Sequence, residues 1–311
     1  MAERPALTAD QEGALSFARI AELERDPVKG NFDAAHLKEI HRRILQDMPH
    51  YAPGEYRPDA DGYSKARALE SSGHRYYVNY PGRGHGEAID KTLADFGGSD
   101  ALRGLSADEF SGKMAKLYAD LDHQHPFVEG NSRTLRTFTA QLARDAGYDL
   151  DWKRANGSVA GRDRLYIARD VEVVKRAYPG LDEARAMATN NRDEYEAYTL
   201  VLAPFGKTAS LQQVIKNATF QAQDIDAAKA LREQSSEDAT KTHPDLAGSF
   251  AKLAAIEHKT VADGLDPRQR ASVIHRAKEA MAVQVERGQR PEQSISEQRQ
   301  APQLDKEAPD R

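Results

Sequence analysis

The chain has 311 residues, a length that suggests about two domains. Its 44 basic and 49 acidic side chains leave a formal net charge of −5, so no basic excess is available for general nucleic-acid binding. Because the sequence contains no cysteine, it excludes disulfide scaffolds, cysteine-ligated zinc, iron–sulfur clusters and cysteine nucleophiles.

The sequence predicts neither a cleaved signal peptide nor a membrane span. Residues 1–5 lack the basic stretch and apolar segment of a signal peptide. The longest apolar run, residues 198–205, is far shorter than the roughly 20 residues that cross a bilayer. We therefore expect a cytoplasmic protein in the producing cell, and its translocation or secretion would need a route without a cleaved signal.

Helical periodicity dominates the first half of the chain. Apolar residues recur at helical spacing in residues 8–25, 33–45, 89–96, 107–121 and 130–146. Gly, Pro, Asp and Ser instead punctuate residues 49–86, where no helical period survives. Within that segment, the aromatic and β-branched residues 74–80 predict a short edge strand or hairpin.

Further helices are expected at residues 162–178, 182–187 and 194–202. A Pro-Phe-Gly break at residues 204–206 then marks the end of the first predicted domain, residues 1–205.

The remainder of the chain is predicted as a helical C-terminal appendage, residues 206–287, and a tail, residues 288–311. Within the appendage, residues 211–286 predict three or four helices, split at His243-Pro244 and at residues 264–267. The tail has no aromatic side chain and only two large aliphatic ones, so we expect it to be disordered. The predicted fold class is mainly α with one small β element.

The stretch from His125 to Arg136 carries the strongest chemical signal. Pro126 keeps the chain extended after His125, and Gly130-Asn131 lies where a loop turns into a helix. The free backbone N–H groups at such a helix start form an anion site, which the helix dipole favours further.

Side chains around this anion site supply further parts. Arg133 and Arg136 are three residues apart, so both guanidinium groups project from one face, which suits more than one phosphate. Glu129 precedes the turn and can hold a Mg²⁺ ion that bridges phosphate oxygens. His125 is placed to take a proton from an incoming hydroxyl. Together these residues predict phosphoryl or nucleotidyl transfer.

Each of these features has an ordinary alternative. A His-Pro-Phe sequence is most often a loop ahead of a buried aromatic ring, and two arginines on a helix are usually solvated. Their joint occurrence within twelve residues is much rarer by chance, so the sequence favours a phosphate site.

The stretch resembles the motif of the Fic (filamentation induced by cAMP) family, H-P-F-x-(D/E)-G-N-G-R-x-x-R. The matching residues are His125, Pro126, Phe127, Glu129, Gly130, Asn131, Arg133 and Arg136. Ser132 departs from the motif, which usually has Gly at that position. Weaker similarity in residues 37–41, 51–57, 121–124 and 146–152 extends the resemblance to about residues 14–200.

The resemblance implies a Fic-type helical core with a β-hairpin flap, and transfer of AMP from ATP to a Tyr, Thr or Ser hydroxyl of a target protein. It implies that His125 is the base, and that Glu129 holds Mg²⁺ against the α- and β-phosphates. Gly130, Asn131 and the amide of Ser132 would form the anion hole, while Arg133 and Arg136 would steady the outer phosphates as pyrophosphate leaves.

Ser132 leads to two different expectations. If the backbone there is helical, Ser costs little and its hydroxyl can donate a hydrogen bond. If the backbone needs a positive φ, activity falls or the nucleotide differs. We expect that catalysis is retained, because the base, the metal residue and both arginines are present.

In the resemblance, residues 74–80 correspond to the flap, whose edge registers the target by strand addition. Its docking residues would be Tyr76, Tyr77, Val78 and Asn79. The ordinary alternative is a solvent-facing loop.

Two modes of restraint are open. Residues 8–13 fit the pattern (S/T)-x-x-x-E-(G/N) of the family's inhibitory helix, in which Glu12 would pair with Arg136. So short a pattern recurs by chance, and the alternative is a separate small antitoxin protein.

The resemblance therefore predicts an adenylyltransferase that acts as a bacterial toxin or translocated effector. One alternative keeps the fold but transfers UMP, phosphocholine or phosphate. Another is a catalytically silent Fic module that binds partners. The C-terminal helices are similar to segments of proteins in conjugation and type IV secretion systems, which suggests that machinery as a partner.

Overall fold

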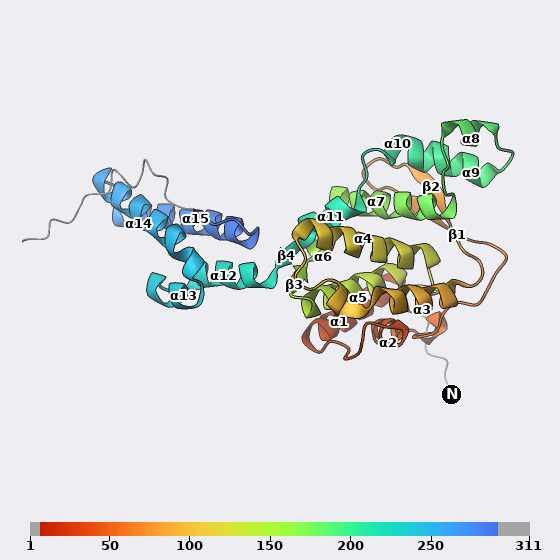
Figure 1. Cartoon of the computed structure of the whole chain (residues 1–311), viewed down its shortest axis with the longest axis horizontal. Helices are drawn as coiled ribbons and strands as arrows, with labels where there is room; N and C mark the ends of the chain where they lie inside the picture. The colour runs from red at the N-terminus through yellow and green to blue at the C-terminus, as the bar shows by residue number, and fades with distance from the viewer. Residues whose placement is uncertain (1–6, 292–311) are drawn as a thin grey trace, which may run out of the picture. The chain divides into compact units, whose positions relative to one another are not determined.

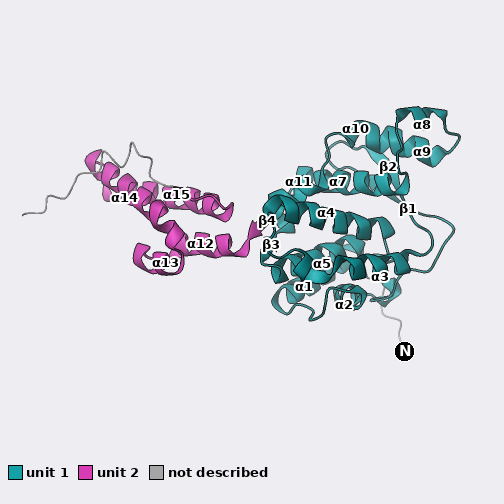
Figure 2. Cartoon of the chain, viewed as in Figure 1, with its two compact units in different colours: residues 1–219 teal, residues 220–311 magenta. Residues whose placement is uncertain are grey.

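The computed structural model describes residues 7–291. The chain divides into two compact units, residues 1–219 and 220–311, which Figure 2 shows in different colours. The absence of a signal peptide was predicted from residues 1–5, which lie outside the described residues. Residues 292–311 of the predicted tail also lie outside the described residues.

Unit 1 is mainly helical (Figure 1). Its elements, in chain order, are α1 (Ala9–Arg25), α2 (Ala34–Leu45), η1 (Pro49–Tyr51), β1 (Tyr63–Ala68), β2 (Arg75–Tyr80), α3 (His85–Phe96), η2 (Gly98–Ala101), α4 (Ala107–Gln124), α5 (Asn131–Asp145), β3 (Tyr148–Leu150), α6 (Trp152–Asn156), α7 (Val159–Ala177), α8 (Glu183–Ala188), α9 (Arg192–Ala197), η3 (Tyr198–Leu202), α10 (Ala203–Phe205) and α11 (Leu211–Ala218).

The core of unit 1 lies around α4, which packs against α3, α5, α7 and α11. Ser106 begins α4 with a capping box, in which its side chain and that of Glu109 satisfy each other's backbone N–H groups. Apolar residues at helical spacing, among them Phe110, Met114 and Leu121, are fully buried. This packing fixes the C-terminal end of α4, after which the motif begins.

The helix α2 forms as its sequence predicts. Asp33 caps it by accepting a hydrogen bond from the His36 N–H, at 2.9 Å. Its apolar stripe, which includes Leu37, Ile40 and Ile44, is fully buried and packs on α1 and α5.

The single strand predicted at residues 74–80 is β2, and it has an antiparallel partner that the sequence analysis missed. Tyr63 pairs with Tyr80, and the register runs to Ala68 opposite Arg75. The sequence of β1, Tyr-Ser-Lys-Ala-Arg-Ala, has too few apolar residues to predict a strand. Contacts between the hairpin and α7 hold it in place, and they depend on the tertiary fold.

Unit 1 extends past the boundary at residue 205 that the sequence analysis placed. Residues of α11, including Leu211 and Ile215, are buried in the same core as α4. A buried apolar face therefore keeps α11 with unit 1, and the compact unit ends at Thr219.

The remaining elements form unit 2 with its own apolar core. They are α12 (Ala222–Glu233), α13 (Ser236–Thr242), η4 (Pro244–Leu246), α14 (Ala247–Ala262) and α15 (Pro267–Glu286), and they follow β4 (Thr219–Gln221), which begins at the last residue of unit 1. In the described residues, 211–286 hold five α-helices rather than three or four. The reason is that β4 separates α11 from α12 and a Ser235 cap begins α13.

The first residues of the predicted tail are packed, which corrects the expectation of disorder from residue 288. The Arg290 guanidinium pairs with Asp224, at 2.6 Å, and with Asp245. The carbonyl of Pro291 accepts a hydrogen bond from Ser249 at 3.0 Å. These polar contacts order the segment without the apolar side chains on which the prediction relied.

Within residues 7–291, no helix is long and apolar enough to cross a membrane.

Candidate active site

The loop between α4 and α5 is built around Gly130, the N-cap of α5, which has a φ of 77°. A Cβ at this position would lie 2.9 Å from Leu45 Cδ1, so both the backbone conformation and the space require glycine. No side chain caps the start of α5. Its first backbone N–H groups are therefore available for an anion, as the sequence predicts.

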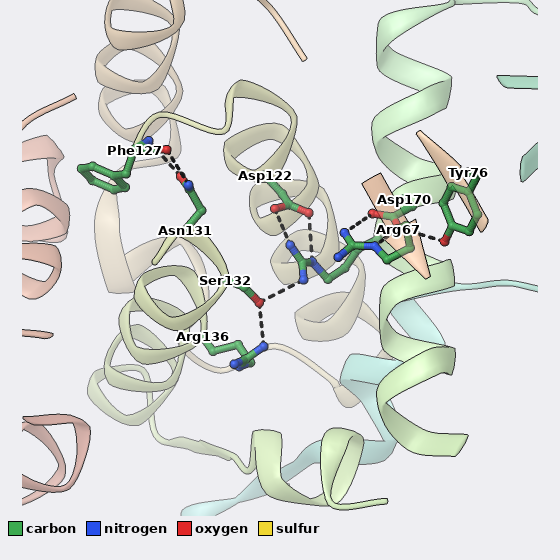
Figure 3. Close-up of polar contacts among 9 residues, drawn as sticks. Arg67, Tyr76, Asp122, Phe127, Asn131, Ser132, Arg136 and Asp170 are labelled. Carbon is green, nitrogen blue, oxygen red and sulfur yellow. Dashed lines mark hydrogen bonds and ion pairs between the residues drawn. The ribbon is translucent and has the colours of Figure 1, made fainter. Parts of the chain in front are cut away.

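Asn131 closes this loop on itself. Its Oδ1 accepts a hydrogen bond from the Phe127 N–H at 2.9 Å, and its Nδ2 donates to the Phe127 carbonyl at 2.7 Å (Figure 3). The side chain of Asn131 is thus committed to holding the loop, and what it offers an anion is its backbone.

His41 of α2 packs against this loop and forms a hydrogen bond with it. Its ring stacks on Phe127, with centroids 3.8 Å apart and planes 5° from parallel. The Gly54 N–H donates to Nδ1 at 2.8 Å, so Nε2 carries the proton and donates to the Glu129 carbonyl at 3.0 Å. Burial lowers the pKa of His41 to about 4, which keeps this tautomer neutral.

His125 follows α4 in a left-handed conformation, with a φ of 43°. Arg57 fixes that backbone by donating from Nε to the His125 carbonyl at 2.9 Å. A non-glycine residue rarely adopts this conformation, and such strain is concentrated at functional sites.

The ring of His125 is almost fully buried, with 6% of the residue exposed. It packs on Tyr80, with centroids 4.2 Å apart, and neither ring nitrogen has a hydrogen-bond partner. Burial lowers the pKa of His125 to about 3, although the carboxylate of Asp122 opposes this change. The imidazole is therefore neutral at physiological pH, and its ring nitrogens are not used by another group.

The carboxylate of Glu129 contacts two cations. Its Oε1 lies 3.1 Å from Arg133 Nη2, and its Oε2 lies 3.5 Å from Lys65 Nζ on β1. Burial raises the pKa of Glu129, but the Gly130 N–H, Lys65 and Arg133 outweigh burial and hold the pKa below its ordinary value. Glu129 is therefore ionised, as a metal-binding carboxylate must be.

The residues present fit Mg²⁺ held together with a nucleotide. Among the described residues, no group of three or more His, Cys, Asp or Glu side chains forms a metal cage. Mg²⁺ is typically bound by one or two carboxylates plus substrate phosphates. The partly exposed carboxylate of Glu129 at the edge of an anion site matches that donor set.

Ser132 lies in the first turn of α5, outside the residues with positive φ. Its Oγ accepts hydrogen bonds from Arg136 Nη1 at 2.7 Å and from Arg169 Nη1 at 3.0 Å (Figure 3). The backbone at Ser132 is therefore helical, as the first of the two expectations requires, but the hydroxyl accepts hydrogen bonds from two arginines where the sequence analysis expected it to donate one.

The two motif arginines have different surroundings. Arg133 donates to Ser16 Oγ of α1 at 2.6 Å and pairs with Glu129. Arg136 is held by Ser132. Burial lowers the pKa of Arg136, and Arg169 lowers it further, although Tyr118 opposes them. An anion beside Arg136 would relieve this crowding of positive charge.

Behind the site, Asp122 of α4 and Arg169 of α7 form a buried two-point ion pair, with nitrogen–oxygen distances of 3.0 and 2.7 Å. The sequence analysis included Asp122 only in the weaker similarity of residues 121–124, and it did not identify Arg169 or the pair. Arg169 lies more than 30 positions after the motif, and no sequence signal distinguishes it from the other arginines of a helix.

The hairpin leaves only one of the four residues predicted for docking largely exposed. Tyr76 and Val78 are buried, and Tyr76 donates its hydroxyl to Asp170 at 2.9 Å (Figure 3). Asn79 donates to the Tyr178 hydroxyl at 2.9 Å. Of the four predicted docking residues, Tyr77 alone is largely exposed, at 61%. The alternation of a strand explains this, because Tyr76 and Val78 face the core.

Glu12 does not contact Arg136 in the described structure. Its carboxylate pairs with His50 Nε2 at 3.1 Å and accepts a hydrogen bond from the Tyr51 hydroxyl at 2.9 Å. The expected contact of an inhibitory glutamate is therefore not made.

Comparisons with known proteins match the first unit. A family model described as the Fic/DOC family matches residues 31–143. The protein adenylyltransferase VbhT of Bartonella schoenbuchensis is 36% identical over 143 residues, which cover 46% of this chain and 27% of VbhT. The probable protein adenylyltransferase Fic of Salmonella typhimurium is 33% identical over 153 residues, which cover 49% of this chain and 68% of that protein.

The match to VbhT thus spans about a quarter of that protein's length. Among solved structures, the BepC protein of Bartonella tribocorum with bound AMPPNP is 19% identical, with a TM-score of 0.45. That match covers 68% of this chain and 86% of the BepC chain.

Proposed function

The chain belongs to the Fic/DOC family, and on that premise we propose that it is a protein adenylyltransferase, which transfers AMP from ATP to a Tyr, Thr or Ser hydroxyl of a target protein. The observation that carries the proposal is His125, a buried and neutral imidazole with unpartnered ring nitrogens, six residues before the uncapped start of α5. Relatives that match this chain are named protein adenylyltransferases.

In the proposed reaction the target's hydroxyl oxygen attacks the α-phosphorus of ATP. A new P–O bond forms, the bond between the α-phosphorus and the oxygen of the leaving pyrophosphate breaks, and the hydroxyl proton passes to His125. The neutral state of His125 supports this role, since a protonated imidazole cannot act as a base.

The start of α5 binds the phosphates in this proposal. The backbone N–H groups of Asn131 and Ser132 would stabilise charge on the α-phosphate, because donors fixed in advance need no rearrangement during the reaction. Arg133 and Arg136 would hold the outer phosphates and stabilise the pyrophosphate as it leaves. Ser132 supports Arg136 in that position through the 2.7 Å hydrogen bond.

Glu129 would hold Mg²⁺ in the same site. When bound, Mg²⁺ neutralises phosphate charge and so favours departure of pyrophosphate. The part played by the chain is to keep the Glu129 carboxylate ionised through the Gly130 N–H and the adjacent cations.

The target would dock along the outer edge of β1. The Leu69 N–H donates to the His74 carbonyl at 2.9 Å, just beyond the strand ends. The alternation of an antiparallel ladder then turns the backbone groups of Ser64, Ala66 and Ala68 outward. These three residues are exposed, so an extended segment of the target can add to this edge.

We also propose that restraint comes from a separate small antitoxin protein, since Glu12 is engaged by His50 and Tyr51. Unit 2, whose described residues are 220–291, would be an appendage for interaction or for delivery through secretion or conjugation machinery. This assignment agrees with the site, because all of the residues named for catalysis belong to unit 1. The protein would then act as a toxin or a translocated effector.

Incubation of the full chain with ATP and with host or bacterial lysate tests the proposal. Mass spectrometry should find target peptides that carry AMP on Tyr, Thr or Ser, and His125→Ala should abolish them. If the modified peptides instead carry UMP, phosphocholine or phosphate, the transferred group is not AMP and the proposed donor is wrong. ATP binding without modification of any protein would favour the silent binding module.

A further inference from the structure

The inner face of β1 presents three alternate residues to the site: Tyr63, Lys65 and Arg67. The ring of Tyr63 lies 5.7 Å from that of His125, centroid to centroid, and the ammonium of Lys65 lies 3.5 Å from Glu129 Oε2. The motif does not include Lys65, and the role described for it above is limited to keeping Glu129 ionised.

Two fixed neighbours hold Lys65 in this position. On one side, the guanidinium of Arg57 lies 4.1 Å from the centroid of the Tyr63 ring. On the other side, Arg67 makes a two-point ion pair with Asp170, at 2.6 and 2.9 Å (Figure 3). The backbone of Lys65 is thus fixed over the site, while its four-carbon side chain can still rotate.

The contact between Lys65 and Glu129 is weak enough to be exchanged. Their side chains are 33% and 39% exposed, and ion pairs of such exposure contribute little to stability. Glu129 also contacts Arg133, so two cations share one carboxylate and leave an excess of positive charge. When a divalent cation takes Glu129, the ammonium loses its carboxylate partner, and the nucleotide phosphates offer another anion.

We propose that Lys65 is a nucleotide-binding residue of this enzyme. In the free protein it neutralises Glu129 and attracts the phosphates of ATP, and it contacts a phosphate oxygen once Mg²⁺ occupies Glu129. The inference deepens the proposed function and rests on it.

The proposal predicts effects of opposite sign on the two ligands. Lys65 attracts the polyanionic nucleotide but repels Mg²⁺ from Glu129, since both are cations. Removing its charge should weaken binding of the nucleotide and strengthen binding of the metal. A side chain that merely stabilised the hairpin would not produce such a split.

The test compares the full-length wild type with Lys65→Met, which keeps the length of the side chain but removes its charge. Lys91→Met is the matched control, because Lys91 is an exposed lysine of α3 that pairs with Asp95. Calorimetry with a non-hydrolysable ATP analogue measures the Kd without metal and then with increasing Mg²⁺. Lys65→Arg tests whether a cation alone is sufficient.

We expect Lys65→Met to raise the metal-free Kd about tenfold, and to lower the half-saturating Mg²⁺ concentration several-fold. Turnover at saturating ATP and Mg²⁺ should fall about tenfold or more, because the phosphate loses a cation in the transition state. Lys91→Met should change none of these values by more than about twofold, and Lys65→Arg should retain most of the binding.

The proposal is overturned if Lys65→Met binds the metal-free analogue as tightly as the wild type. It is also overturned if the variant changes only the KM for the target protein, which would assign Lys65 to docking. A wild type that does not bind the analogue would refute both this inference and the proposed function. A wild type that binds but transfers nothing would refute the proposed function alone.

Discussion

Asp122 at the end of α4 and Arg169 in the middle of α7 are joined by two hydrogen bonds, and both side chains are almost completely buried. The third guanidinium nitrogen of Arg169 donates to Ser132. One arginine therefore links the helix that ends at His125 to the helix that begins at the anion site, and the relative position of base and phosphate site depends on it.

Removing one partner of this pair should destabilise unit 1 severely. Asp122→Asn leaves the buried Arg169 without its counter-charge, and the expected loss is about 3–5 kcal/mol in the free energy of unfolding. Fluorescence of the single tryptophan, Trp152 in α6, during urea unfolding reports on this unit. Glu70→Gln is the control, because it breaks an exposed ion pair with Arg162 on the same α7 and should cost less than about 1 kcal/mol. Equal losses would contradict the assignment.

Restoring the family's glycine at position 132 should not improve the enzyme. Ser132→Gly keeps the backbone N–H but removes the acceptor of two arginines, so stability should fall by about 2–3 kcal/mol. The rate of AMP transfer should stay within about fivefold of the wild type, roughly 1 kcal/mol in activation free energy.

Ser132→Ala separates the two causes, because it removes the hydroxyl without the helix penalty of glycine. The rates of AMP transfer by the wild type and by the two Ser132 variants are measured on one purified target protein. A tenfold gain in rate for Ser132→Gly would show that Ser132 impairs catalysis.

Gly130 should be far less tolerant than another glycine of the same conformation. Gly130→Ala combines a positive φ with a Cβ placed 2.9 Å from Leu45, and we expect a loss of about 2–4 kcal/mol. Gly73 has a φ of 69° and no heavy atom within 4 Å of such a Cβ, so Gly73→Ala should cost about 1 kcal/mol. Tryptophan fluorescence in urea compares the two variants, and similar losses would mean that the close approach to Leu45 is unimportant.

His125 should make the stability of the protein dependent on pH. Its pKa is lowered from 6.5 to about 3 in the folded state, so the unfolded chain binds a proton more readily. The contribution of His125 to the free energy of unfolding is therefore fully present above pH 6.5. It is lost as the pH falls toward 3, by at most about 1.4 kcal/mol per pH unit.

His125→Gln removes this contribution while other buried histidines, such as His41, remain. Urea unfolding of both proteins at pH 7, 5.5 and 4.5 should show the wild type losing about 1 kcal/mol more for each pH unit below 6. Parallel curves would show that the imidazole is not held neutral by burial.

Glu12 should not restrain the enzyme. Glu12→Gly breaks the contacts with His50 and Tyr51, and the rate of transfer should change by less than about threefold, below 1 kcal/mol in activation free energy. Tyr51→Phe is the matched variant, since it removes the same hydrogen bond from the other side. A rise of tenfold or more in Glu12→Gly alone would instead establish self-inhibition.

The sequence by itself determined the local parts of the site. The stretch from His125 to Arg136 predicts a loop, a glycine hinge and a helix start, because these depend on residues close together in the chain. The stripe of α2 and the cap at Asp33 are local in the same sense. The apolar pattern of residues 74–80 likewise predicts β2, although not which of its side chains face solvent.

The tertiary structure alone decided what surrounds those parts. Strand β1 has few large apolar residues; it pairs with β2 along its length, and Arg67 also ties it to Asp170, 103 positions away. Arg169 and Lys65 are ordinary charged residues until the fold places one behind Ser132 and the other against Glu129. Because charges interact through space, two charged residues that are far apart in the chain can pair without any periodicity or fixed spacing in the sequence that would predict the pair. The burial that makes His125 neutral arises in the same way, from the aromatic rings of the hairpin that packs over it.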